Sequence, residues 1–220
     1  SPHPASGRER GPPQANNEER LRNTYPPATV NSCTLIHTHI PYHTPTDRTK
    51  GQAMKILHLM RHAKSAWDQP GLSDRERGLN KRGQRDAPRM GEALSKRMAA
   101  MSVTVSPARR AQLTLEGLCA GWPALAELPH YMEEDLYTFA APDLLEWISA
   151  QDDSHRRLFI IGHNPAFTDL VNILTGDNSL HNLPTAGYVE LALAIDHWRD
   201  LQQACALMPY SLFPRQLSQD

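Results

Sequence analysis

Cysteines are few in this chain, and their spacing suits neither a disulfide scaffold nor a zinc ribbon. The three cysteines, Cys33, Cys119 and Cys205, are scattered and form no CxxC pair, which indicates a reducing compartment. No apolar run approaches the roughly 18 residues needed to span a bilayer, and no charged-then-apolar segment opens the chain. The formal net charge of −1 lacks the basic surplus of a general nucleic-acid binder. We therefore expect a soluble, cytoplasmic protein that binds neither nucleic acid nor membranes.

The composition of the 220 residues changes near Met54. Residues 1–53 contain 8 of the 18 prolines and few aliphatic side chains, so they cannot bury enough apolar surface to offset the entropy lost on ordering. We expect them to be a disordered extension, which need not be native, and residues 54–220 to form one domain. Three histidines of the extension lack an accompanying cysteine or carboxylate cluster, so we interpret them as part of a flexible tail rather than a metal site. They are His37, His39 and His43.

Within residues 54–220, short apolar runs alternate with stretches of helical spacing. The runs predict strands and the stretches predict helices. The expected strands cover residues 55–60, 103–105, 157–161, 189–195 and 205–208, and the expected helices cover 81–98, 106–118, 142–150 and 167–174. Strands alternating with helices are typical of a three-layer α/β/α domain. We expect a mixed, mainly parallel sheet of about five or six strands with helices on both faces.

Capping residues mark several of the expected helix ends. Asn80 is a plausible N-cap of the first helix, in which Pro88 indicates either a kink or a second start. Ser106-Pro107 and Asn164-Pro165 each combine a capping residue with a proline at the first helical position. Gly176 predicts the end of the helix that follows Asn164-Pro165.

Two histidines follow apolar strands, and the first of them comes directly after an arginine. They lie in Arg61-His62 and Gly162-His163, and a third strand is followed by Ser106-Pro107-Ala108-Arg109-Arg110. Ligands of open α/β sheets bind at the carboxyl ends of the strands. Arginine forms paired bonds to phosphate, and a helix N-terminus also favours an anion. This pattern predicts a phosphate site with a histidine nucleophile.

These motifs resemble those of the histidine phosphatase superfamily, which has the phosphoglycerate mutase-like fold. The resemblance rests on Arg61-His62, the Ser-Pro-x-x-Arg segment at 106–110 and Gly162-His163-Asn164-Pro165. Residues 61–65, Arg-His-Ala-Lys-Ser, and 79–83, Leu-Asn-Lys-Arg-Gly, are similar to the short bacterial branch of SixA-type phosphohistidine phosphatases. The resemblance covers roughly residues 54–215 and implies the phosphoglycerate mutase-like fold.

The resemblance also implies a set of site residues. His62 would be the nucleophile that accepts the phosphoryl group and forms a covalent phosphohistidine, later hydrolysed by water without a metal or other cofactor. Arg61, Arg110 and His163 would hold the phosphate oxygens. Arg110 matches the family arginine because it stands four residues after Ser106. Thr185 lies in a segment similar to one near the family's pocket.

The proton donor for the leaving group is the least defined part of the pattern. Other branches of the superfamily carry an acid between the second motif and the second histidine, where this chain offers Glu134 or Asp135. The SixA-type branch has no clear acid there. An alkoxide leaves badly without a general acid, whereas imidazole, with a pKa near 6.5, can be protonated by solvent. We therefore expect a phosphatase that acts on protein phosphohistidine. We also expect it to be a monomer.

Two other functions remain as alternatives. One is a phosphatase of small phosphoesters such as sugar or nucleotide phosphates, and the other is a phospho-binding module without turnover. Several neighbouring residues are also open to two interpretations. Lys81-Arg82 either steers an anionic substrate or belongs to a charged helix face, and Trp67 and Tyr137 either line the entrance or simply pack.

Overall fold

The computed structural model describes residues 55–68 and 70–217. The predicted extension 1–53, with its three histidines, lies outside the described residues. In the described ranges, no helix is both long enough and apolar enough to cross a membrane.

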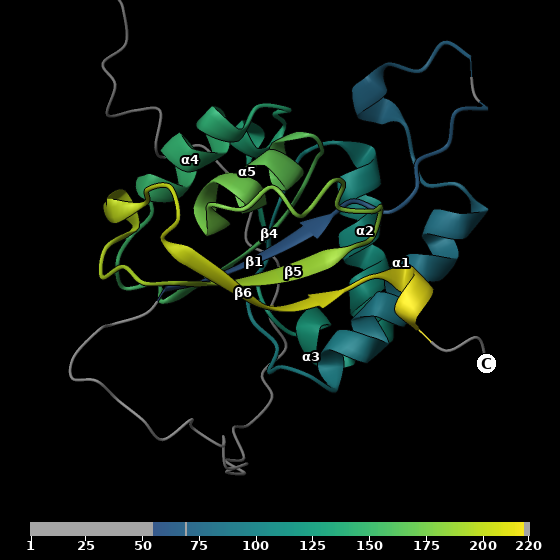
Figure 1. Cartoon of the computed structure of the whole chain (residues 1–220). Helices are drawn as coiled ribbons and strands as arrows, with labels where there is room; N and C mark the ends of the chain where they lie inside the picture. The colour runs from purple at the N-terminus through teal and green to yellow at the C-terminus, as the bar shows by residue number, and fades with distance from the viewer. Residues whose placement is uncertain (1–54, 69, 218–220) are drawn as a thin grey trace, which may run out of the picture. The chain divides into compact units, whose positions relative to one another are not determined.

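A single sheet of six strands forms the centre of the domain (Figure 1). Its strand order is β3-β2-β4-β1-β5-β6. The three pairs from β3 to β1 are parallel, and β5 and β6 add antiparallel pairs. The strands are β1 (Lys55–Arg61), β2 (Thr104–Val105), β3 (Tyr131–Met132), β4 (Arg157–Gly162), β5 (Tyr188–Leu193) and β6 (Ala206–Leu212). The predicted mixed, mainly parallel sheet is confirmed.

Helices cover both faces of the sheet: α4 and α5 lie on one face, and α1, α2 and α3 on the other (Figure 1). They are α1 (Lys81–Ser95), α2 (Arg109–Gly121), α3 (Pro123–Ala126), α4 (Ala141–Ser149) and α5 (Ala166–Thr175). Short 3₁₀ turns are η2 (Asp74–Glu76), η3 (Glu134–Leu136), η4 (Trp198–Asp200) and η5 (Pro214–Gln216).

Each central strand contributes to two cores. In β4, Leu158 and Ile160 pack with α4 and α5, while Phe159 and Ile161 pack with α1 and α2. The sequence of a strand that is covered on both faces is a continuous apolar run, whereas a strand covered on one face alternates apolar and polar residues. This burial explains why the sequence of β4 was recognisable. It also makes the domain the three-layer α/β/α arrangement that was predicted.

Most predicted elements are present, but some of their ends differ, and two short elements, α3 and β3, were not predicted. Helix α1 is capped by Asn80, whose side chain accepts a hydrogen bond from Gly83 N at 2.9 Å, but it ends at Ser95 and runs through Pro88 without interruption. The predicted starts at Ser106-Pro107 and Asn164-Pro165 are wrong, because α2 begins at Arg109 and α5 at Ala166. Strand β3 was missed because its two residues are exposed and carry no apolar pattern. The predicted stop at Gly176 is confirmed by its left-handed conformation.

Helices α1 and α2 approach so closely that glycine is required at their contact. A Cβ added at Gly91 would lie 2.3 Å from the carbonyl oxygen of Leu118, and one added at Gly121 would lie 1.9 Å from that of Pro88. Backbone atoms cannot rotate away as a side chain can. The close approach therefore fixes how α2, and the arginines of its first turn, sit against the sheet.

We predict that Gly91→Ala destabilises the domain by about 2 kcal/mol, because the added methyl group forces the two helices apart. Urea unfolding followed by circular dichroism measures the change. Ser95→Ala, at an exposed position of the same helix, serves as the control and should lie within about 0.5 kcal/mol of the native protein. An unchanged midpoint for Gly91→Ala would contradict the close contact.

Candidate active site

The sequence motifs meet at the carboxyl edge of the parallel strands. Arg61, the last residue of β1, is in register with Gly162, the last residue of β4. The N–H of His62 donates to Gly162 O, and the N–H of Ser106 donates to Ile161 O, both at 3.0 Å. Three segments far apart in the sequence are thus tied together by main-chain bonds where their strands end.

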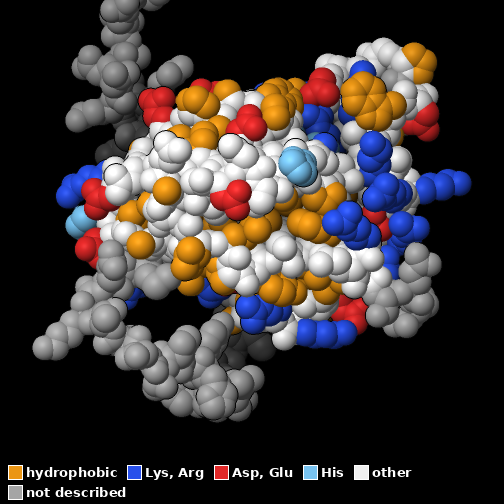
Figure 2. Space-filling model, in the orientation of Figure 1, with side chains coloured by type: hydrophobic (Ala, Val, Ile, Leu, Met, Phe, Trp, Pro, Cys, Tyr) orange, Lys and Arg blue, Asp and Glu red, His pale blue; other side chains and the backbone are white. Residues whose placement is uncertain are grey.

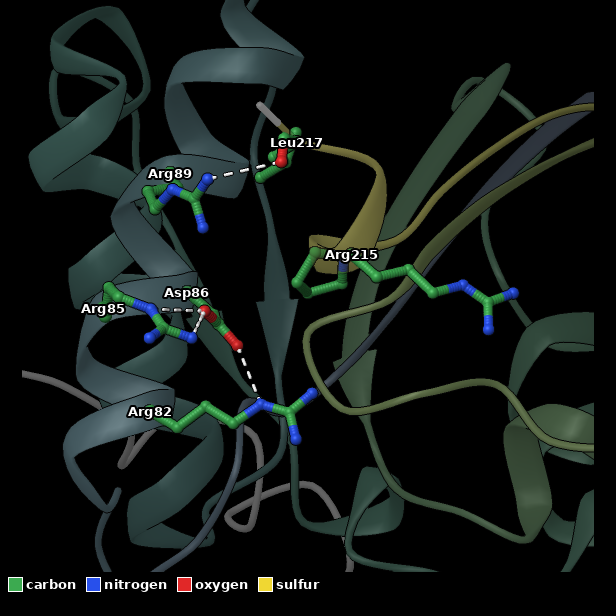
Figure 3. A pocket seen from close by; sticks show the side chains of 7 residues that line it. Arg82, Arg85, Asp86, Arg89, Arg215 and Leu217 are labelled. Carbon is green, nitrogen blue, oxygen red and sulfur yellow. Dashed lines mark hydrogen bonds and ion pairs between the residues drawn. The ribbon is translucent and has the colours of Figure 1, made fainter. Parts of the chain in front are cut away.

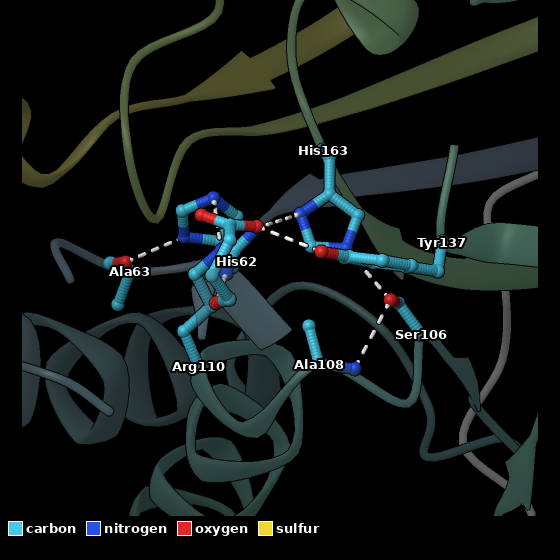
Figure 4. A network of polar contacts seen from close by, with 8 residues as sticks. His62, Ala63, Ser106, Ala108, Arg110, Tyr137 and His163 are labelled. Atoms are coloured by element: carbon cyan, nitrogen blue, oxygen red, sulfur yellow. Dashed lines mark hydrogen bonds and ion pairs between the residues drawn. The ribbon is translucent and has the colours of Figure 1, made fainter. Parts of the chain in front are cut away.

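His62 is buried, and one nitrogen of its ring is held by a hydrogen bond to the main chain (Figure 4). Its Nδ1 lies 2.7 Å from the carbonyl oxygen of Ala63. A carbonyl can only accept, so we assign the proton of the neutral ring to Nδ1. This leaves a lone pair on Nε2, which accepts a hydrogen bond from Nε of Arg110 at 3.3 Å. The atom that a nucleophile would use is therefore the one facing the guanidinium.

Arg110 occupies the centre of the site, and only 4% of its surface is exposed. It lies in the first turn of α2, as the sequence predicted. Its Nη1 donates to the main-chain oxygen of Asp74 at 2.5 Å, and its Nη2 donates to the Asp74 carboxylate at 2.9 Å. Nη2 also lies 3.4 Å from Nδ1 of His163. Arg110 thus joins both histidines to a carboxylate.

His163 is held in one orientation by its two ring nitrogens. Arg110 can only donate to Nδ1, so the proton lies on Nε2, which donates to Ser106 Oγ at 2.6 Å. Ser106 Oγ also accepts from the N–H of Ala108 at 3.4 Å, and it does not cap α2 because the helix begins only at Arg109. The rings of His62 and His163 lie 5.1 Å apart between centroids.

Both histidines are neutral at physiological pH. Burial, with a smaller contribution from the nearby Arg110, lowers the pKa of His62 to about 3, although the hydrogen bond to Ala63 acts in the opposite direction. Burial followed by the influence of His62 and Arg110 lowers the pKa of His163 to about 2. A neutral imidazole keeps its lone pair, so His62 needs no base to become a nucleophile.

Arg61 lies beside this group without a direct bond to either histidine. Its Nη1 donates to Leu183 O at 2.8 Å and to Asn182 Oδ1 at 3.3 Å. Its Nε is buried and has no hydrogen-bond partner. Burial lowers the pKa of the guanidinium. A buried donor without a partner is costly, so Nε is available for an anion.

The segment around Thr185 also reaches the site. The N–H of Ala186 lies 3.1 Å from the main-chain oxygens of both Arg61 and His62. Thr185 is therefore next to the residue that closes the loop over the end of β1. Asn164, which was expected to cap α5, instead donates through Nδ2 to Asn182 Oδ1 and Leu183 O at 3.0 Å each.

The two candidate acids are not brought to the histidines. Glu134 forms an ion pair with Arg75 at 2.6 Å, and both side chains are largely exposed. Asp135 is exposed, and its N–H donates to Glu133 Oε1. Both acids line a neighbouring cavity of about 520 Å³. Neither makes a hydrogen bond to His62, Arg110 or His163 in the described part of the chain.

Sequence reasoning missed Asp74 and left the role of Tyr137 open. The Tyr137 hydroxyl donates to the Asp74 carboxylate at 2.8 Å, and its ring meets that of His163 edge-on with 5.5 Å between centroids. Burial raises the pKa of Asp74, but the hydrogen bonds from Tyr137 and Arg110 outweigh it and leave the pKa below its ordinary value. Asp74 is thus a carboxylate, not an acid, at neutral pH.

Another residue that the sequence analysis missed, Thr114, contacts Ala63, the residue after His62. Its Oγ1 accepts from the N–H of Ala63 at 2.8 Å and donates to the Arg110 carbonyl at 2.7 Å. It therefore links the loop after β1 to α2. As for metals, the described residues contain no group of three or more histidines, cysteines and acids close enough to hold an ion.

Comparisons with known proteins agree with this geometry. Residues 57–155 match the histidine phosphatase superfamily (branch 1), a range that includes Arg61, His62 and Arg110 and ends before His163. An uncharacterized Mycobacterium tuberculosis protein, Rv1276c, is 32% identical over 166 residues, covering 71% of this chain and all of the relative.

Solved structures show the same fold. A SixA-type protein from Agrobacterium tumefaciens is 24% identical with a TM-score of 0.61, and the match covers 73% of this chain and 98% of that one. The protein histidine phosphatase SixA complexed with tungstate is 21% identical with the same TM-score, and the match covers 74% and 99%. With the superfamily match, the Mycobacterium relative and the geometry at the strand ends taken together, this chain belongs to the histidine phosphatase superfamily and is a phosphatase.

Proposed function

We propose that the protein is a phosphohistidine phosphatase that works through a covalent intermediate on His62, without a metal. The observation that carries this proposal is the state of His62: a buried, neutral imidazole whose proton is held on Nδ1 by Ala63 O at 2.7 Å. Its Nε2 lone pair faces Arg110. A fixed, unprotonated nucleophile beside a cation suits attack on a phosphoryl group.

The reaction has two steps. Nε2 of His62 donates its lone pair to phosphorus, and the bond from phosphorus to the substrate's imidazole nitrogen breaks. That nitrogen keeps the electron pair and takes a proton from solvent. Water then attacks the phosphohistidine, gives a proton to solvent, and releases orthophosphate and free His62.

Arg110, Arg61 and His163 are the proposed partners of the phosphoryl oxygens. Arg61 contributes a buried Nε that has no partner, and Arg110 contributes donors that now contact Asp74. An arriving phosphoryl group must therefore replace the Asp74 carboxylate on Arg110. Thr185, beside Ala186, is proposed to line the entrance.

The absence of an acid at the described site favours phosphohistidine over an alkyl phosphoester. The nearest carboxylate, Asp74, has a lowered pKa and cannot supply a proton at neutral pH, and Glu134 and Asp135 contact other residues. Imidazole, with a pKa near 6.5, can take its proton from water, whereas an alkoxide gains a hundredfold or more, roughly, from a general acid. The structural likeness to SixA proteins agrees with this choice.

The first prediction concerns the substrate. In excess EDTA, the protein should release phosphate from a phosphohistidine protein much faster than from serine, sugar or aryl phosphates. His62→Ala and His62→Gln should each lower this rate by roughly a thousandfold or more, because the nucleophile is lost. Fast turnover of an alkyl phosphate would favour the small-molecule phosphatase. Phosphate binding without any turnover would favour a binding module.

The second prediction concerns the charge of the nucleophile. Because burial lowers the pKa values of His62 and His163 to about 3 and about 2, their imidazoles should stay neutral throughout the range in which an ordinary histidine, with a pKa of about 6.5, becomes charged. NMR shifts of the imidazole Cε1–H groups, followed from about pH 8 to pH 5, measure this, with His62→Gln to assign the signal. A His62 midpoint near the ordinary value would contradict a neutral resting site.

The third prediction concerns Asp74, which competes with phosphate for Arg110. Asp74→Asn removes the competing charge, so inhibition by orthophosphate should become about three- to tenfold stronger, the effect of one charged contact at a partly exposed site. Asp135→Asn is the matched control and should change it less than about twofold, because Asp135 makes no hydrogen bond to His62, Arg110 or His163. Equal inhibition of the native protein and Asp74→Asn would contradict the competition.

A further inference from the structure

Four arginines line one open cavity of about 480 Å³ between α1 and the segment that follows β6 (Figure 3). We call this cavity the arginine groove. In Figure 2, Lys and Arg side chains gather on the right of the molecule, over the region where Figure 1 places α1. The arginines are Arg82, Arg85, Arg89 and Arg215. Since the whole chain has a net charge of −1, this concentration of positive charge is local.

One acid, Asp86, accompanies the four arginines in the lining of the groove. Its side chain is only 3% exposed, and it accepts from Arg82 Nε at 3.3 Å and from Arg85 Nε and Nη2 at 3.1 and 2.9 Å. The side chains of Arg82 and Arg85 are 56% and 63% exposed. Four arginines and one aspartate leave a formal charge of +3. The buried carboxylate orients part of this charge toward solvent without cancelling it.

The arginines of α1 form a row along one helix face. Arg82, Arg85 and Arg89 stand at positions i, i+3 and i+7, which share a face and span about 10 Å along the axis. Arg89 also donates to Leu217 O at 3.5 Å. The opposite wall is Pro214 and Arg215 of η5. A partner surface with carboxylates in a row of similar length, as on an acidic helix, would match this spacing.

The two walls of the groove start at the same edge of the sheet as His62. Where α1 begins, the N–H of Asn80 donates to Lys64 O at 3.0 Å, two residues after the nucleophile. On the other wall, β6 ends at Leu212, which is in register with Tyr188, and Tyr188 is in register with Met60. Strand β6 is two strands from β1, or about 10 Å. A protein docked in the groove could therefore also reach His62.

We propose that the arginine groove binds an acidic surface of the phosphoprotein substrate and so places its phosphohistidine against His62. This inference rests on the proposed function. It adds a contact that only a protein substrate can make, because a small phosphoramidate does not reach the groove. Complementary charge beside a reactive site raises the rate of productive encounter and selects among partners. Of the pair Lys81-Arg82, for which the sequence left open a role in steering an anion, Arg82 lines this groove.

The variant that tests the proposal is Arg82→Glu with Arg215→Glu. Arg85 is left in place because it must still pair with the buried Asp86, and Arg89 because it contacts Leu217. The matched control is Arg156→Glu with Arg199→Glu, two exposed arginines near the opposite edge of the sheet, where β4 begins and in η4. Both variants change the net charge equally.

The substrate is a small helical protein phosphorylated on one histidine, prepared in three versions. Three surface positions at helical spacing carry glutamate, glutamine or lysine. At low ionic strength the native protein should have a kcat/KM about tenfold higher for the glutamate version than for the glutamine version, the effect expected of a few exposed ion pairs. The Arg82→Glu/Arg215→Glu variant should lose this preference and favour the lysine version, and the control should keep it. Salt near about 0.5 M should remove the difference.

Phosphoimidazole, which is too small to reach the groove, separates the two proposals. The native enzyme, the Arg82→Glu/Arg215→Glu variant and the control variant should hydrolyse phosphoimidazole at equal rates. Equal turnover of the glutamate and glutamine versions would overturn the docking proposal while leaving phosphohistidine activity intact. A loss of phosphoimidazole turnover in the groove variant would also overturn it, since the groove would then act on the chemistry. Failure of the native protein on phosphoimidazole and on all versions would instead overturn the proposed function.

Discussion

The arrangement of the site depends on one buried guanidinium. A charge removed from water is costly unless it is paired and hydrogen-bonded, and Arg110 meets that requirement with His62, His163 and Asp74, which lie 48, 53 and 36 residues away in sequence. Four loops and helices are thus held by one side chain. Its own position follows from helix packing, because α2 can lie this close to α1 only where Gly91 and Gly121 have no side chains. The packing of α1 against α2 therefore also fixes the position of Arg110 in the site.

Burial, with a smaller contribution from the same guanidinium, keeps both histidines neutral. Two imidazoles next to a cation and shielded from water cannot readily become charged, and their lowered pKa values follow. Each ring also has one nitrogen fixed by a neighbour, Ala63 O for His62 and Ser106 Oγ for His163. The chemistry is thus prepared by orientation and desolvation, and no general base beside His62 is required.

Elements with a local pattern could be predicted from the sequence, and those formed by distant contacts could not. The buried strands β1 and β4, the cap at Asn80 and the stop at Gly176 all follow from neighbouring residues. Ser106 and Asn164 have the composition of helix caps, but the structure uses their side chains for bonds to His163 and to Asn182. The contact of Asp74 with Tyr137 spans 63 residues and joins segments without periodicity, so no sequence pattern announces it.

Gly162 determines how closely the core packs beneath the site. A Cβ at this last residue of β4 would lie 2.7 Å from the Phe167 ring, so the aromatic ring packs directly under the strand end that carries His163, and 1% of His163 is exposed. In-line displacement requires water to approach phosphorus along the direction in which the first leaving group departed. In the proposed mechanism this direction is the one that the leaving imidazole vacates, so the dephosphorylated partner must leave that space before water can enter it.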